Sequence, residues 1–148
     1  MWDARSGESL RTLKGHRGPV SSSAWSGDGR RIISGSWDNT LQVWDARSGE
    51  SLRTLEGHRG AVSSCAWSGD GGRIVSASND GTVRVWDAAT GALLLSIFRF
   101  PRGEEAAIGE SPRRVLRASP GAWRWLGWLA PDPSTGAIDR YPYETFRE

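Results

Sequence analysis

Two histidines, each followed by an aspartate at the same distance, are the residues of this sequence whose types could do chemistry. His16 precedes Asp38 by the same interval as His58 precedes Asp80, with serines between the members of each pair. A serine, a histidine and an aspartate in hydrogen-bond contact can activate a hydroxyl for acyl transfer. However, no G-x-S-x-G motif presents a nucleophilic serine on a sharp turn. Because the set occurs twice in one chain, we interpret it as structural and expect no enzymatic activity.

The sequence offers little else that could act chemically. It contains one cysteine, Cys65, which excludes an internal disulfide and a cysteine-based zinc cluster. Its neighbours are small or apolar, so we expect a buried and unreactive thiol. Phosphate-binding glycine motifs and metal-ligand clusters are both missing from the sequence. We therefore expect no cofactor and no metal.

The histidines belong to an internal repeat whose units follow one another without a gap. Trp2, Trp44 and Trp86 are evenly spaced, and residues 2–43 match residues 44–85 at 32 of 42 positions. Copies this similar indicate a recent duplication, and a period of this length is typical of repeat architectures. The repeat, rather than the individual histidines, is therefore the unit that must fold.

Each unit contains four short segments with the composition of strands. In the first unit they are Val20–Trp25, Arg31–Ser36, Thr40–Asp45 and Glu50–Leu55, separated by turns such as Gly27-Asp28-Gly29. No segment before residue 100 reads as a helix of three or more turns. This pattern predicts an all-β protein made of antiparallel meanders.

Two dipeptides recur at matching places in the units. Gly15-His16 and Gly57-His58 are followed by Trp44-Asp45 and Trp86-Asp87. With these dipeptides and this period the chain resembles the WD40 repeat family, whose fold is a β-propeller of four-stranded blades around a central channel. The resemblance implies a partial propeller with two full four-stranded antiparallel blades, residues 15–56 and 57–98. Two blades are too few to close a ring alone.

The same resemblance gives the polar residues a structural role. WD40 blades contain a buried network in which a carboxylate orients an imidazole, the imidazole bonds a hydroxyl, and the hydroxyl accepts from an indole N–H. Two sets of positions match this network: His16, Asp38, Trp44 and Ser36 (or Ser34, on the same strand face), and His58, Asp80, Trp86 and Ser78 (or Ser76).

The ends of the chain depart from the repeat. Residues 1–14 read as the remnant of a preceding blade, with Trp2-Asp3 ending a third strand and Glu8–Leu13 forming a fourth. Residues 99–148 read as a linker over Pro101–Pro112 followed by an irregular C-terminal β segment, with strands at Val115–Ala118, Trp123–Leu129 and Ala137–Tyr141. We interpret the chain as the C-terminal portion of a longer propeller protein; the alternatives are self-assembly that closes a propeller and an open or non-functional remnant.

Differences between the two copies indicate where a partner binds. Trp37 is replaced by Asn79, and Pro19 is replaced by Ala61. The resemblance implies that partners bind beside the turn aspartate and at the start of the first strand, where Trp and Arg often anchor interfaces. The partner-binding candidates are Arg17, Pro19, Trp37, Arg59, Ala61 and Asn79. The chain is thus predicted to be a non-catalytic scaffold or sensor module for a protein or peptide; the alternative is that Trp37 covers a loop and the arginines are solvated.

Two other functions remain open. Trp123 and Trp125 share one face of a predicted strand and could stack on a sugar, as in a lectin-like carbohydrate binder. The near-identical, arginine-rich repeats resemble those of large bacterial WD40 proteins, so the chain could also be a regulatory fragment of a multidomain signalling enzyme or NTPase.

Composition limits the remaining partners and the location. The net charge is only +2, and arginines are interleaved with acidic residues, so we expect no nucleic-acid binding. The longest apolar-rich stretch, Leu93–Phe100, is far shorter than the roughly 18–20 residues of a membrane helix. The N-terminus has no apolar segment typical of a secretory signal. We therefore expect no membrane association and a cytoplasmic location.

Overall fold

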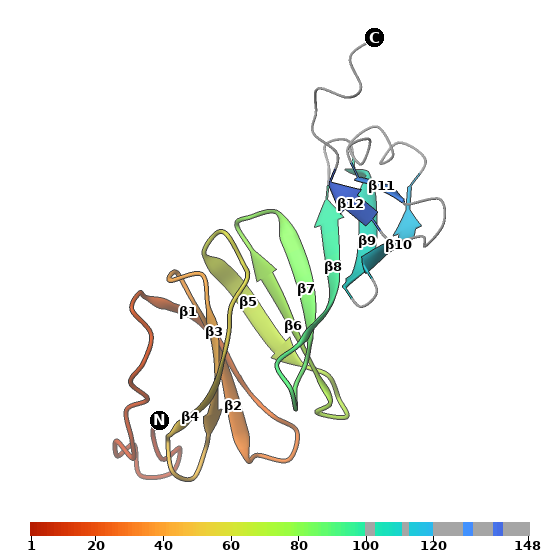
Figure 1. The fold of residues 1–148 in the computed structure, drawn as a ribbon. Coiled ribbons are helices and arrows are strands. Elements are labelled where there is room, and N and C mark those ends of the chain that lie inside the picture. Colours follow the sequence, from red (N-terminus) through yellow and green to blue (C-terminus); the bar gives the residue numbers. More distant parts are fainter. Residues whose placement is uncertain (100–102, 111–112, 120–128, 132–137, 141–148) are drawn as a thin grey trace.

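A computed structural model describes residues 1–99, 103–110, 113–119, 129–131 and 138–140, and shows two antiparallel sheets side by side (Figure 1). The first contains, in order, β1 (Val20–Trp25), β2 (Arg31–Ser36), β3 (Leu41–Asp45) and β4 (Ser51–Leu55). The second contains β5 (Val62–Trp67), β6 (Arg73–Ser78), β7 (Thr82–Asp87), β8 (Leu93–Arg99), β9 (Glu105–Glu110) and β10 (Arg113–Ala118). A third, small sheet pairs β11 (Leu129–Pro131) with β12 (Ile138–Arg140). The predicted all-β partial propeller is confirmed. Within the described ranges there is no helix long and apolar enough to cross a membrane.

The duplication in the sequence is repeated in the strand register. Ile32 pairs with Trp44 in the first sheet, and Ile74 pairs with Trp86 in the second. The register also shifts at matching places, between Val20 and Ser22 in β1 and at the equivalent step in β5. The two blades therefore offer the same side chains on the same faces, and can be compared position by position.

One difference between the copies is explained by a turn. Asn39 has a φ of 69° and Gly81, its counterpart, has a φ of 81°. This is the left-handed region, which glycine adopts without strain and asparagine tolerates better than other residues. The turn between the second and third strands therefore accepts either residue.

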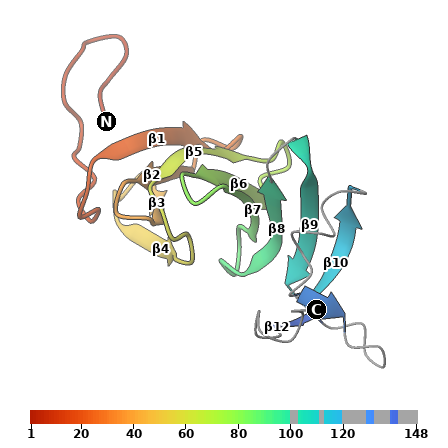
Figure 2. The same cartoon turned by 90° about the horizontal axis from the view of Figure 1, so that it is seen from above.

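The core lies between the two sheets. Ile33, Leu41 and Val43 of the first sheet face Val62 and the large buried side chains of the second, with exposed fractions of 0–2%. Seen from above, β1 lies beside β5 (Figure 2). Further bonds cross this boundary: the Trp67 indole N–H donates to the Ala24 carbonyl at 3.3 Å, and the Arg31 guanidinium lies 4.6 Å from the Trp67 ring centroid. Gly35 admits the Val62 side chain, because a Cβ there would lie 2.5 Å from Val62 Cγ1.

The C-terminal region differs from the expected linker. Glu105–Glu110 forms β9, which pairs along β8 from Leu95↔Gly109 to Arg99↔Glu105, so the prediction of a loop over Pro101–Pro112 is wrong for this part. The backbone groups along the outer edge of β8 find partners in β9, and Ala106 and Ile108 become buried. The predicted strand Val115–Ala118 is confirmed within β10.

The three other predicted strands have different outcomes. Glu8–Leu13 does not form a strand; its one bridge joins Trp2 and Ser9, and the Met1 carbonyl accepts from the amides of Leu10 and Arg11. Ala137–Tyr141 is confirmed at Ile138–Arg140. Of the predicted strand Trp123–Leu129, residues 123–128 lie outside the described residues, and Leu129 begins β11.

Val62 and Val20 occupy the same position in the two blades, and only Val62 is covered, with an exposed fraction of 0% against 55%. We expect Val62→Ala to lower the free energy of unfolding by about 2 kcal/mol, because it removes buried methyl groups and leaves a cavity. Val20→Ala is the matched control and should change it by less than about 0.5 kcal/mol. Urea denaturation at low protein concentration measures both, and equal losses would contradict the assigned boundary between the sheets.

Candidate functional site

A polar network ties the chain entering each blade to its sheet. In the first blade, His16 Nδ1 lies 2.9 Å from Asp38 Oδ2, and His16 Nε2 lies 2.8 Å from Ser34 Oγ. The Trp44 indole N–H donates to the same Ser34 Oγ at 2.8 Å. His16 comes from the segment before β1, Asp38 from the turn after β2, and Trp44 from β3. Because Ser34 belongs to β2, the network joins the entering segment, the turn and two strands of one blade.

The second blade reproduces this geometry. His58 Nδ1 lies 2.9 Å from Asp80 Oδ2, and its Nε2 lies 2.8 Å from Ser76 Oγ. The Trp86 indole N–H donates to Ser76 Oγ at 2.9 Å. The imidazole and indole meet edge to face in both copies, with interplanar angles of 65°.

The hydrogen bonds determine the tautomer of the imidazoles. An indole nitrogen can only donate, so each serine oxygen accepts from the tryptophan. An ionised carboxylate can only accept, so Nδ1 carries the proton and its N–H donates to the aspartate. The Nε2 of the neutral imidazole is then unprotonated and accepts from the serine hydroxyl. Every polar group in the network therefore has a partner while the imidazole is neutral.

The aspartates are held ionised in both blades. Burial opposes the charge on Asp80, but the Thr82 hydroxyl, the Arg59 amide and His58 all donate to it, and its pKa is held far below the usual range. The pKa of Asp38 is held low by the equivalent donors. Burial lowers the pKa of His58, and the bond to Asp80 offsets this only in part. In the second blade, a neutral His58 beside a charged Asp80 is therefore the stable arrangement.

The serines in these networks are Ser34 and Ser76, and the assignment of Ser36 and Ser78 is wrong. Ser36 Oγ donates to the Gly18 carbonyl at 3.1 Å and accepts from the Asp38 amide, so it holds the entering loop against the turn. Residues two apart share a strand face, so alternation could not choose between them. The choice depends on how far the Trp44 indole reaches across the sheet from its paired position at Ile32.

Thr40 and Thr82 also belong to the networks, although sequence reasoning missed them. Each donates its hydroxyl to the aspartate two residues earlier, at 2.7 Å from Thr40 and 2.6 Å from Thr82. An aspartate followed two residues later by threonine, in both copies, was the available signal for this local bond.

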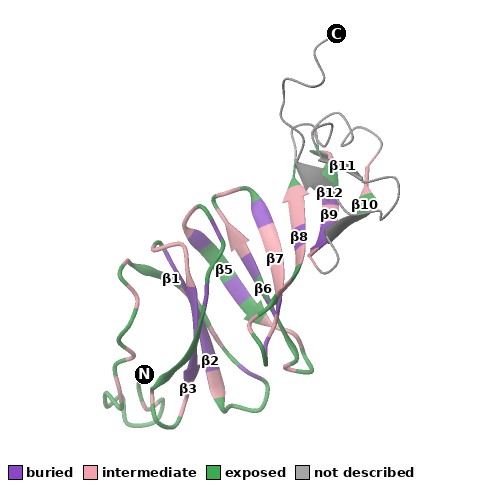
Figure 3. Ribbon diagram, in the orientation of Figure 1, coloured by how far each residue is buried: buried purple, intermediate pink, exposed green. Residues whose placement is uncertain are grey.

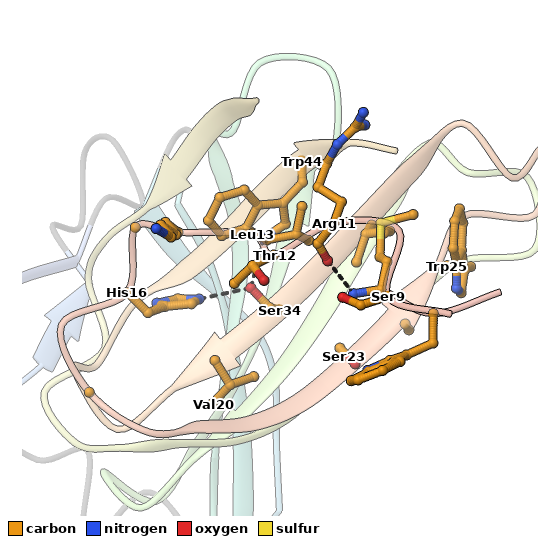
Figure 4. Close-up of a pocket in the computed structure, with 17 residues that line it drawn as sticks. Ser9, Arg11, Thr12, Leu13, His16, Val20, Ser23, Trp25, Ser34 and Trp44 are labelled. Carbon is orange, nitrogen blue, oxygen red and sulfur yellow. Dashed lines mark hydrogen bonds between the residues drawn. The ribbon is translucent and has the colours of Figure 1, made fainter. Parts of the chain in front are cut away.

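Burial argues against a catalytic role for this serine, histidine and aspartate. Ser34 is 5% exposed and Ser76 is 1% exposed, and an indole N–H occupies a lone pair of each hydroxyl. The first network borders a cavity of about 720 Å³, lined by the N-terminal segment and the outward face of the first sheet (Figure 4). Even there the His16 side chain is only 5% exposed. Because the covered second copy has the same distances, the geometry belongs to the blade and not to a substrate site.

The partner-binding candidates lie around the entering loop and the turn of each blade. The Trp37 amide donates to the Pro19 carbonyl at 2.9 Å, and the Arg17 amide donates to Asp38 Oδ2 at 2.9 Å. Trp37 is 64% exposed, and Arg17 and Pro19 are exposed. In the second blade the Asn79 amide donates to the Ala61 carbonyl and the Arg59 amide to Asp80; Ala61 alone of the six is half-buried. The structure brings each triplet together at one end of its sheet.

The groups that could bind a metal or react as a nucleophile are few. In the part of the chain that the structure describes, no group of three or more histidine, cysteine or acidic side chains could hold a metal ion. Burial between the sheets raises the pKa of the Cys65 thiol, which disfavours the reactive thiolate.

Comparison with known proteins agrees with this geometry. The family model "WD domain, G-beta repeat" matches residues 7–45 and 49–87, each match ending at the aspartate that closes the third strand. The chain belongs to the WD40 family. It is similar to the Periodic tryptophan protein 2 homolog of Schizosaccharomyces pombe, 46% identical over 43 residues, and to that of Neurospora crassa, 44% identical over 43 residues. Each match covers 29% of this chain and only 5% of the relative's length. Both relatives are fungal, so the resemblance to bacterial WD40 proteins stays a prediction.

Removing the Ser76 hydroxyl would leave the Trp86 indole N–H and His58 Nε2 without their partner. We expect Ser76→Ala to lower the free energy of unfolding by about 1–3 kcal/mol, the loss typical of a buried unsatisfied group. The exposed Ser64, on the neighbouring strand, provides the control, and Ser64→Ala should change it by less than about 0.5 kcal/mol. Urea denaturation measures both, and a neutral Ser76→Ala variant would contradict the network.

The lowered pKa of His58 predicts how stability depends on pH. The unfolded chain protonates this residue near its ordinary pKa of 6.5, and the folded chain does so only at lower pH. The free energy of unfolding should therefore fall as pH drops below about 6.5, by up to about 1.4 kcal/mol per pH unit from this group. Denaturation curves from pH 7.5 to 5.5 test this, and His58→Gln should flatten the slope. Stability that rises on acidification would contradict the assignment.

Proposed function

We propose that this chain is a non-catalytic protein-interaction module that binds a protein or peptide through the loop face, defined as Arg17, Pro19, Trp37, Arg59, Ala61 and Asn79. The observation that carries the proposal is Trp37, a large aromatic side chain that is 64% exposed at a turn. Tryptophan is strongly enriched among residues that anchor interfaces. Its counterpart is the polar Asn79, so the blade does not need an aromatic residue here to fold.

The backbone beneath the loop face supports this role. Asp38 accepts from the Arg17 amide on the entering loop and from the Thr40 amide after the turn, at 2.9 and 3.0 Å. The bond from the Trp37 amide to Pro19 closes the same corner. A surface held in this way loses little conformational entropy when a partner binds. The buried network thus serves binding by fixing the loops.

Family membership supports the same class of function, since WD40 domains are generally protein-interaction scaffolds. A role as a sensor module in a longer, cytoplasmic protein is part of this proposal. The lectin alternative depends on Trp123 and Trp125, which lie outside the described residues. The alternative of a regulatory fragment of a bacterial signalling enzyme or NTPase stays a prediction.

Selection of peptides from a displayed library against the full chain tests the loop face. For the tightest peptides, Trp37→Ala should weaken binding about 30-fold or more, equivalent to about 2 kcal/mol, because a buried aromatic anchor is lost. Trp25→Ala is the control: it is 54% exposed but lies at the opposite end of β1, and it should leave the dissociation constant unchanged.

Calorimetric titration of both variants gives the comparison. Peptides that bind the Trp37→Ala variant as tightly as the unmodified chain would overturn the assignment of the loop face.

A further inference from the structure

Each of the two sheets has an outer face, on the side away from the other sheet, that is largely apolar. The contact between the two sheets shows which side chains would cover such a face. The leading face is the side of the first sheet away from the second. It contains the exposed Val20, Ser23 and Trp25, and the buried Ile32 and Trp44, which line a cavity together with the N-terminal segment. The trailing face is the opposite side of the second sheet and contains Val75, Ala77, Val83 and Val85. Figure 3 shows that β2 and β3 are mostly buried, whereas β1 is largely exposed.

At two matched positions the exposure depends on whether the neighbouring sheet covers the side chain. On the leading face Val20 is 55% exposed, and its counterpart Val62 is 0% exposed under the first sheet. On the trailing face Val75 is 37% exposed, and its counterpart Ile33 is 0% exposed under the second sheet. The two faces left open are therefore the two halves of one interface that the chain already forms once.

The polar contacts of that interface are also available on the open faces. Between the sheets, Arg31 stacks on Trp67, the Trp67 indole donates to the Ala24 carbonyl, and Ser22 Oγ accepts from the Cys65 amide. On the trailing side, the groups that correspond to Arg31, the Ala24 carbonyl and Ser22 are Arg73, the Ala66 carbonyl and Ser64. On the leading face, the groups that correspond to Trp67 and the Cys65 amide are Trp25 and the Ser23 amide. Each contact can form again between two chains.

Differences in size between the faces are small. Ala77 replaces Gly35 and adds a Cβ where the neighbour's valine lies, at a spot where Val62 Cγ1 would be 2.5 Å away. Val75 and Val83 replace Ile33 and Leu41 and each remove one methylene nearby. The smaller side chains leave room for the valine to shift, as core packing tolerates when total volume is kept.

The N-terminal segment lies where strand β8 of an incoming second sheet would lie, since residues 8–13 correspond to β4 and β8 in the repeat. Arg11 donates to the Arg47 carbonyl just as Arg53 donates to the Ala89 carbonyl one repeat later. The segment is exposed over most of its length. It is joined to itself by the bridge Trp2↔Ser9 and a few backbone hydrogen bonds, and to the first sheet by the Arg11 bond. The free energy of local opening is small for an exposed segment with few buried contacts. An incoming sheet can therefore displace the N-terminal segment.

We infer that a second copy of this chain docks head to tail, with the trailing face of one copy on the leading face of the next. The occupant follows from the interface between the two sheets, which pairs the same residues. The contact is heterologous, so it can propagate along a row of chains. The inference does not rest on the loop face, which lies at the ends of the sheets and stays exposed in the row.

Charge substitutions on each face test the inference with the full chain. We expect the mass of the unmodified chain, measured by analytical ultracentrifugation, to rise with concentration beyond twice the monomer mass of 16.1 kDa. Val20→Lys and Val75→Lys should each remain monomeric at all concentrations, because each loses one half of the contact. A one-to-one mixture of the two variants retains one complete contact and should form a dimer and nothing larger.

Leu52→Lys is the matched control. Leu52 is 51% exposed, and its counterpart Leu94 stays 39% exposed although its own sheet is covered, so this position lies outside the interface. This variant should associate like the unmodified chain. If a lysine variant fails to fold by circular dichroism, the milder Val20→Thr and Val75→Thr replace it. A chain that is monomeric throughout, or single variants that still associate, or a mixture that stays monomeric, would each overturn the inference.

Discussion

Each blade depends on one buried hydroxyl that bonds two rings. Ser34 in the first blade and Ser76 in the second accept from an indole and donate to an imidazole, and the imidazole in turn donates to an aspartate on the next turn. If any one of these groups leaves the network, another buried polar group loses its hydrogen-bond partner, which is energetically unfavourable. The loop before the first strand and the turn after the second therefore move as one body with the sheet. This rigidity fixes the loops that form the surface that we propose for partner binding.

Stacking of the sheets is the second requirement. A blade has two apolar faces, and in this chain each sheet covers one face of the other. The same valine position is buried in one copy and half exposed in the other, although the local sequence is almost unchanged. Burial here is thus a property of the neighbour rather than of the strand. By contrast, the distances within the polar network are the same in both copies, so the network is a property of the single blade.

Much of the fold could be predicted from the sequence because each strand and turn of the blade occurs in two aligned copies. The even spacing of the two units, the turn glycines and the alternation in Thr40–Asp45 predicted strands that the structure shows. The serine of the network could not be chosen, because Ser34 and Ser36 share a strand face and only the reach of the Trp44 side chain separates them. Strand β9 was missed because its pairing depends on an available edge of β8, which no local pattern in Glu105–Glu110 announces. For the candidate binding residues, the sequence placed them at a turn, and the hydrogen bonds show them gathered at one corner of each blade.

Hydrogen exchange at the tryptophan indoles tests most directly whether these polar sets are structural. The indole N–H of Trp86 donates to a buried serine, whereas Trp37 is 64% exposed. By nuclear magnetic resonance with assignment through single substitutions, the Trp86 and Trp44 indole protons should exchange at least about 100-fold more slowly than that of Trp37, because exchange requires the blade to open. Exchange at Trp86 as fast as at Trp37 would show that the hydroxyl, imidazole and indole are accessible in the folded chain, and would contradict their structural role.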